Sequence, residues 1–221
     1  VFKMEEFKKE RKEDCALTEC GITAKDAAFS WGFRVKEDQS NKKNFQVEVE
    51  TVETPTLQNV NFDLKHDSLL MVAGKIGTGK TTLLFSIMEE NRRMQGTLDI
   101  RGKIAYVEQE PFIFSSTVEE NITFGLEYND ERFKRCVEAA CLTSDMELFS
   151  NGQKTVIGER GINVSGGQKA RISLARAIYQ DADIYLLDDP LSAVDPEVAN
   201  KIFENAILGA LANKCVVLVT H

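Results

Sequence analysis

Long hydrophobic runs and a basic surplus are both missing from this sequence of 221 residues. Its longest apolar runs, such as residues 69–73 and 215–219, fall far below the roughly 20 residues that a membrane-spanning helix needs, and the N-terminus has no signal-peptide core. The formal net charge of -8 disfavours a nucleic-acid partner, because such domains usually carry a surplus of Lys and Arg. We therefore expect neither a membrane span in this segment nor a nucleic-acid partner.

Cysteine and histidine are too few and too widely spaced for a structural zinc site. The chain has 5 cysteines and 2 histidines. Its two C-x4-C pairs, Cys15 with Cys20 and Cys136 with Cys141, lack the C-x2-C spacing and the nearby histidines of such sites. We expect reduced, structural thiols in a cytosolic compartment.

The remaining composition is that of an ordinary globular domain, with 43% apolar and 28% charged residues. Apolar strand-like runs alternate with helical patterns along most of the chain, which predicts a parallel sheet covered by helices. The expected strands are 68–73, 103–107, 183–187 and 215–219. The expected helices are 80–90, 167–179 and 196–211.

The regions outside this alternation have their own patterns. Residues 22–31 and 57–64 look strand-like, and the polar stretch 36–56 between them is expected to be a mobile insertion. Residues 112–164 read mostly helical and are expected to form a subdomain, whereas the charged residues 1–14 suggest a helical linker. Since the chain starts at Val1 and stops at His221 directly after a strand-like run, we expect it to be a piece of something longer.

Residues 74–81 read G-K-I-G-T-G-K-T and match the phosphate-binding pattern G-x-x-x-x-G-K-[ST]. The glycines let successive backbone N–H groups converge on phosphate oxygens, and the helix N-terminus adds positive potential. Lys80 is expected to reach the β- and γ-phosphates, and the Thr81 hydroxyl to ligate Mg²⁺. A plain glycine-rich turn is the alternative, but the pattern arises by chance in roughly one chain in a hundred of this size, before a strand and helix are required.

Residues 186–190 read L-L-D-D-P, so an apolar strand ends in two adjacent carboxylates that repel each other unless a cation lies nearby. An aspartate at a strand end before proline is, taken alone, more often a turn residue. Beside a phosphate-binding loop, however, Asp188 stands where such proteins hold Mg²⁺. We therefore expect Asp188 to be a metal ligand.

Residues 164–168 read V-S-G-G-Q and lead into a helical pattern. Ser165 alone could be a helix N-cap followed by two permissive glycines. Together with the other motifs, these residues resemble the signature of ATP-binding-cassette (ABC) proteins. The resemblance places Walker A at 74–81, the Q-loop at Gln109, Walker B at 184–188, the D-loop at 192–195 and the switch histidine at His221.

Four further stretches are similar to the first nucleotide-binding domain of C-subfamily ABC proteins. They read F-S-W at 29–31, E-N-I-T-F-G at 120–125, G-E-R-G-I-N-V-S-G-G-Q at 158–168 and D-D-P-L-S-A-V-D at 188–195. That subfamily includes multidrug-resistance-associated transporters, sulfonylurea receptors and the cystic fibrosis chloride channel. The polar insertion after Trp31 also resembles the one in the channel's first domain.

The resemblance implies an α/β P-loop core with a parallel sheet, an antiparallel β-subdomain and an α-helical subdomain over residues 22–221, preceded by a linker at 1–21 from a membrane domain. It also implies roles for single residues. Catalysis would involve Lys80, Gln109, Asp188, Asp189 and His221. Trp31 would stack on adenine, and the other ATP contacts would be Gly74, Lys75, Ile76, Gly77, Thr78, Gly79, Lys80, Thr81, Thr82 and Gln109. The Mg²⁺ ligands would be Thr81, Gln109 and Asp188.

A second cassette is part of the same implication. Val164, Ser165, Gly166, Gly167 and Gln168 would contact an ATP molecule held by that partner, so that a dimer encloses two nucleotides. Glu159 and Arg160 would lie near the surface that faces the membrane-spanning domains. His66, in a polar turn, is expected to be merely exposed.

Asp189 departs from the pattern of most hydrolysing ABC domains, in which the residue after the Walker B aspartate is a glutamate that orients or deprotonates the attacking water. The shorter side chain withdraws the carboxylate by up to about 1.5 Å, one C–C bond. A misplacement of about 1 Å costs on the order of a hundredfold in rate. We expect ATP binding to survive and hydrolysis at this site to be slow.

The expected function is that of an ATP-binding, weakly hydrolysing domain at the cytosolic face of a membrane, the first of two in an integral membrane protein. With Mg²⁺ and ATP as cofactors, it would drive export of organic anions or conjugates, since transporters dominate the subfamily. A regulatory domain that gates a channel or receptor is the alternative within the subfamily. A soluble ABC ATPase of DNA repair or translation is disfavoured by the acidic charge and the C-subfamily motifs.

Overall fold

A computed structural model describes residue 16 and residues 19–36, 48–51, 54–161 and 163–221. Most of the linker expected at 1–21, including Cys15, lies outside the described residues, as do 37–47 and 52–53 of the expected insertion. Within the described part of the chain, no helix is long and apolar enough to cross a bilayer.

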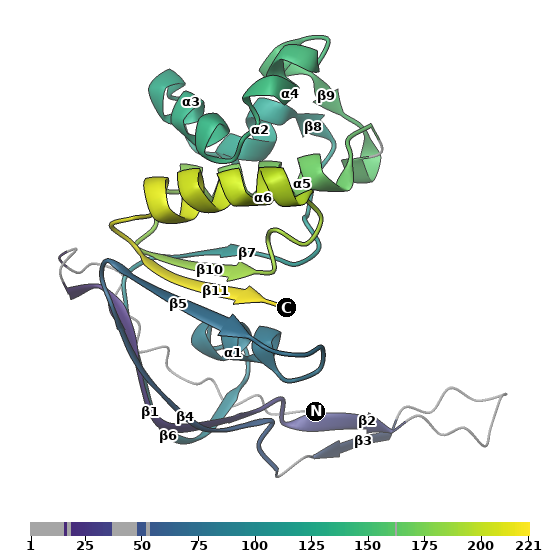
Figure 1. Cartoon of the computed structure of the whole chain (residues 1–221). Coiled ribbons are helices and arrows are strands. Elements are labelled where there is room, and N and C mark those ends of the chain that lie inside the picture. Colours follow the sequence, from purple (N-terminus) through teal and green to yellow (C-terminus); the bar gives the residue numbers. More distant parts are fainter. Residues whose placement is uncertain (1–15, 17–18, 37–47, 52–53, 162) are drawn as a thin grey trace, which may run out of the picture.

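A parallel sheet forms the centre of the molecule, in the strand order β5-β11-β10-β7 (Figure 1). Its strands are β5 (Ser68–Ala73), β7 (Ile104–Val107), β10 (Ile184–Asp188) and β11 (Cys215–Thr220). The two inner strands are buried almost throughout, which explains their uninterrupted apolar sequence. Because all four strands run in one direction, their carboxyl ends meet at one edge.

An antiparallel sheet packs on the other side of helix α1 (Lys80–Ile87), which lies between the two sheets in Figure 1. Strand β1 (Gly21–Ser30) is its centre and pairs with β4 (Leu57–Lys65) and β6 (Arg92–Arg101). Leu84 and Ile87 of α1 are buried in the core between the sheets. A separate pair of strands, β2 (Phe33–Lys36) and β3 (Glu48–Thr51), lies at the borders of the expected insertion.

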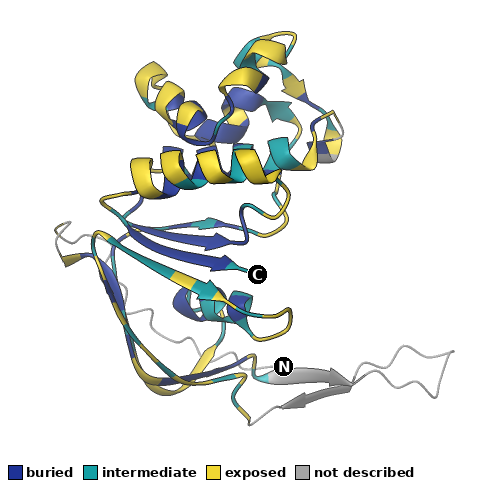
Figure 2. Ribbon diagram, in the orientation of Figure 1, coloured by how far each residue is buried: buried dark blue, intermediate teal, exposed yellow. Residues whose placement is uncertain are grey.

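The opposite face of the parallel sheet is covered by α5 (Gly166–Tyr179) and α6 (Pro196–Ile202), beyond which smaller elements form a further layer (Figure 1). These are α2 (Val118–Thr123), α3 (Asp130–Ala139), α4 (Thr143–Leu148), the short pair β8 (Ser116–Thr117) and β9 (Val156–Ile157), and the 3-10 turns η2 (Gly152–Lys154) and η3 (Glu159–Gly161). Figure 2 shows the buried residues concentrated in the inner strands and on the facing sides of these helices. The mixed α/β fold class is thereby confirmed.

Candidate nucleotide site

The loop between β5 and α1 takes the conformation that a phosphate cradle needs. Gly77 and Gly79 have φ angles of 82° and 91°, which favour residues without a Cβ. Lys80 starts helix α1, and its ammonium group donates to the carbonyl oxygens of Gly74 at 2.6 Å and Lys75 at 3.0 Å. The lysine thus lies across its own loop, within reach of any group that the loop encloses.

The two adjacent aspartates lie at the same edge of the sheet. Asp188 ends β10 and is only 2% exposed, and the Tyr106 hydroxyl of neighbouring β7 donates to its Oδ2 at 3.4 Å. Burial, and then the charge of Asp188, raise the pKa of Tyr106 far above its usual range, so this hydroxyl stays protonated. Asp189 follows with a left-handed φ of 48°, which turns the chain out of the strand.

His221 connects the lysine to the second aspartate. Its Nδ1 lies 3.2 Å from the Lys80 ammonium and its Nε2 lies 3.0 Å from Oδ2 of Asp189. A lysine ammonium only donates, so this contact requires an unprotonated Nδ1 and places the imidazole proton on Nε2, facing the carboxylate. We infer this tautomer from the contacts. Oδ2 of Asp189 is buried. Although Nε2 of His221 lies close to it, no donor among the described residues has good hydrogen-bond geometry toward this oxygen.

Parallel pairing of β11 with β5 brings these groups together, because Thr220 is the register partner of Ala73. His221 and Gly74, the next residues along the two strands, therefore lie side by side. In the same way, β10 pairs with β11 and places Asp188 opposite Val219. The sequence motifs named Lys80, Asp188, Asp189 and His221, and the structure brings all four to one edge.

The donor set at this edge fits Mg²⁺ held partly by phosphate. Mg²⁺ usually binds through one or two carboxylates plus substrate phosphates and water, not in an all-protein cage. Asp188 supplies the buried carboxylate, and the Thr81 hydroxyl, on the first turn of α1, makes no hydrogen bond within the described residues. Those residues also contain no group of three or more His, Cys, Asp or Glu side chains able to hold a metal by themselves.

Two further expected contacts lie at the border of the site. Trp31 follows β1 and is 39% exposed, and its ring packs edge-on against Phe85 of α1 with centroids 5.5 Å apart. Trp31 is thus partly exposed beside the helix that follows the glycine loop. Gln109 is exposed in the segment that follows β7, the strand next to β10.

The signature residues form the start of α5, apart from the glycine loop in sequence. Ser165 is the N-cap, and its hydroxyl accepts from the Gln168 backbone N–H at 3.2 Å while Gln168 Oε1 accepts from the Ser165 N–H at 2.8 Å. This reciprocal capping box leaves Ser165 and Gly166 exposed. The N-cap alternative and the signature role are thus compatible, since the cap presents the helix N-terminus to solvent.

The comparisons with known proteins agree with this arrangement. A family model described as ABC transporter matches residues 57–192, more than half of the chain. The chain belongs to the ABC transporter family. Its relatives include ABC transporter C family member 9 of Arabidopsis thaliana, 44% identical over 218 residues, which cover 98% of this chain and 13% of that protein.

Two other C-family relatives show the same pattern. ATP-binding cassette sub-family C member 4 of Homo sapiens is 50% identical over 169 residues, or 76% of this chain and 13% of that protein. Putative ABC transporter C family member 15 of Arabidopsis thaliana is 44% identical over 218 residues, or 98% of this chain and 19% of that protein. This ABC domain is therefore related to C-family transporters and spans only 13–19% of the length of these relatives.

The sequence did not indicate how the signature of this ABC domain is held in place. Gln168 uses its amide Nε2 to donate to Asp145 of α4 at 2.8 Å. Arg171, one turn further along α5, donates to the other Asp145 oxygen at 2.5 Å and to the Cys141 carbonyl at 2.6 Å. Asp145 reads in sequence as one more surface acid, and only the packing of α4 on α5 makes it a partner of the signature.

The D-loop lies directly against the signature of this ABC domain. A Cβ built on Gly167 would lie 3.1 Å from the Ala193 carbonyl oxygen, so a larger residue at 167 would push the two segments apart. The Ser192 hydroxyl in turn donates to the Asp189 carbonyl at 3.0 Å. Asp195 ends this loop as the N-cap of α6, accepting from the Val198 N–H at 3.2 Å.

Four exposed apolar side chains on the segments around α2 were not predicted from the sequence, those of Phe112, Phe124, Leu126 and Tyr128. Phe112 and Phe124 are 56% and 48% exposed, and Phe124 has a left-handed φ of 47° at the C-terminus of α2. Beneath them, the buried Arg176 donates to the Phe112 carbonyl at 2.7 Å and lies 4.9 Å from the Phe124 ring centroid. Large aromatic side chains held out by a buried arginine suggest a contact surface.

The remaining sequence expectations are placed as follows. Glu159 is exposed in η3, whereas the side chain of Arg160 lies outside what the structure describes. Cys136 and Cys215 are buried, and burial raises the pKa of their thiols to about 11 and about 12.

Proposed function

We propose that this ABC domain is the first of two nucleotide-binding domains in a C-family exporter. In this role it binds Mg-ATP at the carboxyl edge of its parallel sheet, hydrolyses it slowly there and lies on the cytosolic side of the membrane. The observation that carries the proposal is Asp189, a short carboxylate in the position after Asp188 whose Oδ2 is directed at His221. The C-family relatives support transport as the activity that the nucleotide drives.

In nucleotide binding, each group around the glycine loop would have a separate role. Backbone N–H groups between Gly74 and Lys80 enclose the phosphates, and Lys80 exchanges its two carbonyl acceptors for phosphate oxygens. His221, freed from the ammonium by the same movement, is then positioned to contact the γ-phosphate. Mg²⁺, held by Thr81, Asp188 and Gln109, would neutralise negative charge on the β- and γ-phosphates.

Hydrolysis at this site would be limited by the reach of Asp189. Its carboxylate is 6% exposed and faces the imidazole of His221, so it is poorly placed to orient a water molecule beside the glycine loop. A glutamate would extend about 1.5 Å further. The side chain of His221 is 42% exposed and can yield to the longer group.

Two composite sites would form between this domain and the second cassette. The start of α5, with Ser165 and Gly166 exposed, and the flanking signature residues Val164, Gly167 and Gln168 would face the ATP of the partner, since a helix N-terminus with free N–H groups attracts phosphate. The exposed aromatic side chains of Phe112 and Phe124 would contact cytosolic loops of the membrane-spanning domains. The transported substrates would be organic anions or conjugates, a proposal that rests on the resemblance to multidrug-resistance-associated transporters.

The test is single-turnover ATP hydrolysis in the full-length protein that contains this domain, with the catalytic residue of the second cassette disabled. Asp189→Glu should raise the rate at this site by on the order of a hundredfold, with little change in ATP affinity. Asp99→Glu, which lengthens an exposed carboxylate on β6, serves as the matched control and should change neither. An unchanged rate in Asp189→Glu would refute the account based on side-chain length.

A further inference from the structure

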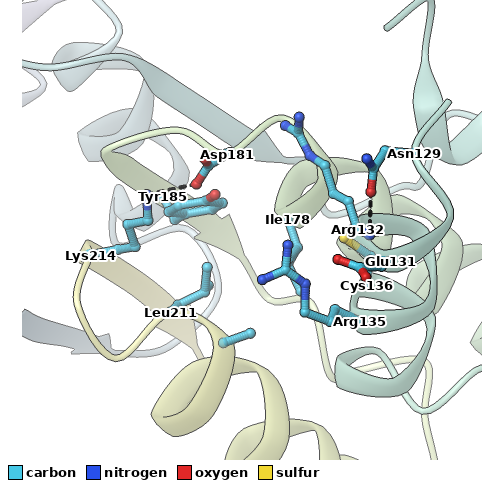
Figure 3. A pocket seen from close by; sticks show the side chains of 11 residues that line it. Asn129, Glu131, Arg132, Arg135, Cys136, Ile178, Asp181, Tyr185, Leu211 and Lys214 are labelled. Carbon is cyan, nitrogen blue, oxygen red and sulfur yellow. Dashed lines mark hydrogen bonds and ion pairs between the residues drawn. The ribbon is translucent and has the colours of Figure 1, made fainter. Parts of the chain in front are cut away.

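A cavity of about 480 Å³ lies at the amino ends of β10 and β11, on the opposite edge of the sheet from the glycine loop. Asp181 and Lys214 border it from the segments before these strands, and Arg132 and Arg135 border it from α3 (Figure 3). Tyr185 lines its wall from β10, three residues before Asp188. At a rise of about 3.3 Å per residue, roughly 10 Å of strand separates the cavity from the metal-binding edge.

The two arginines at this cavity carry charges that no carboxylate neutralises. Among the described residues, neither Arg132 nor Arg135 has an Asp or Glu oxygen within ion-pair distance. Arg132 instead stacks on the Tyr179 ring, with its guanidinium carbon 4.6 Å from the centroid. Tyr179 is itself fixed, because its hydroxyl donates to the Glu127 carbonyl at 2.7 Å. Such stacking holds a guanidinium in place while leaving its N–H groups free to bind.

The other charged groups at the cavity leave its potential positive. Lys214 and Asp181 form a pair at 2.9 Å and largely cancel each other. The pKa of Asp181 is held below its usual range by the hydrogen bond from Lys214, and the charges of Arg132 and Arg135 lower it further. Glu131 is the one remaining carboxylate among the residues that line the cavity, so two unpaired guanidinium groups exceed one acid there. The cavity is thus locally positive in a chain of net charge -8.

The rest of the wall is apolar apart from one hydroxyl. Ile178, Leu211 and the Tyr185 ring provide hydrocarbon surface. The Tyr185 hydroxyl accepts from the Ala182 N–H at 3.0 Å, and among the described residues its own proton has no acceptor. Tyr185 is almost completely buried, so it contributes mainly hydrocarbon surface to the wall.

We propose that this cavity binds a small organic phosphate, a phosphate monoester attached to a compact apolar body. The two guanidinium groups offer paired N–H donors that match phosphate oxygens, and a dianion balances them better than a carboxylate does. The apolar wall accommodates the organic part. This site is separate from the nucleotide site, and the cavity volume falls within the range of small-molecule pockets.

The probe for the test is phenyl phosphate, titrated by calorimetry into the 221-residue chain with Mg-ATP present in excess to fill the glycine loop. We expect the double variant Arg132→Gln/Arg135→Gln to weaken phenyl phosphate binding at least tenfold and to leave Mg-ATP binding unchanged. Glu131→Gln should strengthen it severalfold by removing the opposing charge. Arg92→Gln, an exposed arginine on β6, is the matched control and should have no effect.

Chemical controls identify the ligand class. Inorganic phosphate should bind more weakly than phenyl phosphate, and benzyl alcohol should not bind. Wild-type affinity in the double arginine variant, or an equal loss in Arg92→Gln, would overturn the proposal. Binding of a phosphoserine peptide without binding of phenyl phosphate would overturn it in favour of a protein ligand. The two proposals can fail separately, because Mg-ATP binding reports on the glycine loop and phenyl phosphate binding reports on the arginines. A wild-type chain that does not bind Mg-ATP would therefore count against the nucleotide site and not against this cavity.

Discussion

Replacing Asp145 by alanine should be among the most destabilising single changes in this domain. Its side chain is 9% exposed and faces the Arg171 guanidinium, which is 15% exposed, and the Gln168 amide. The substitution leaves a largely buried cation with two backbone acceptors, the carbonyls of Cys141 and Gly167, but without its counter-charge. Breaking a buried pair by removing one partner costs 3–5 kcal/mol, and the partial exposure puts this case at about 3 kcal/mol.

The measurement is urea unfolding of the wild type and of four variants, one of which is a control. Asp145→Ala and Arg171→Met should each lose stability, Asp145→Ala by about 3 kcal/mol. The double variant Asp145→Leu/Arg171→Met should lose much less than the sum, since well-packed apolar residues often replace a buried ion pair at little cost. Asp130→Ala breaks an exposed pair with Lys134 and is the control, with no measurable change expected.

The opposite result would refute this reasoning. If Asp145→Ala were no more harmful than Asp130→Ala, the ion pair would not fasten α4 to the signature. Turnover distinguishes the positioning role of Asp145 from its effect on stability, because Asp145→Ala also removes the hydrogen bond that holds the Gln168 amide. Turnover of the full-length protein should therefore fall further in Asp145→Ala than in an equally destabilised variant whose substitution lies elsewhere.

Three other outcomes are expected. Lys80→Ala should weaken Mg-ATP binding to the isolated domain and Trp31→Ala should reduce adenine recognition, as measured by calorimetry; unchanged affinity in both would remove these assignments. Ser165→Arg should leave ATP affinity of the isolated domain nearly intact but depress turnover in the full-length protein, and a large loss of affinity in isolation would mean that Ser165 contacts its own domain's nucleotide. With iodoacetamide at pH 8, Cys141, which is partly exposed, should react well before Cys136, whose thiol is buried with a raised pKa; equal rates, read by mass spectrometry, would contradict the burial of α3.

Most of the parallel sheet could be predicted from the sequence because its inner strands are apolar over their whole length. β6 was missed because its sequence, R-R-M-Q-G-T-L-D-I-R, is mostly polar and exposed, and it becomes a strand by pairing with β1. The helix expected at 80–90 ends at Ile87, and Glu89 has a left-handed φ of 60°. The helix expected at 196–211 is divided into α6 and a π-helical segment, η4 (Phe203–Ala210), for which the sequence carries no recognised signal.

For the site, too, features encoded by neighbouring residues could be predicted, whereas contacts that depend on the tertiary fold could not. The glycine loop, Asp188 and the cap at Ser165 are encoded by short contiguous patterns. The link from Lys80 through His221 to Asp189 depends on β11 lying between β5 and β10, an order that chain sequence does not reveal.

The close approach of Gly167 to Ala193 has a consequence for cross-talk between two bound nucleotides. In the proposed dimer the start of α5 touches the nucleotide of the partner, while Asp189 faces the nucleotide of its own chain. A contact from Gly167 to Ala193, a peptide bond to Ser192 and a hydrogen bond from Ser192 to Asp189 connect the two. Because Gly167 has no side chain, a shift of the signature would press directly on the Ala193 backbone, and in the proposed dimer the pocket at Asp189 would then respond to the nucleotide at the signature.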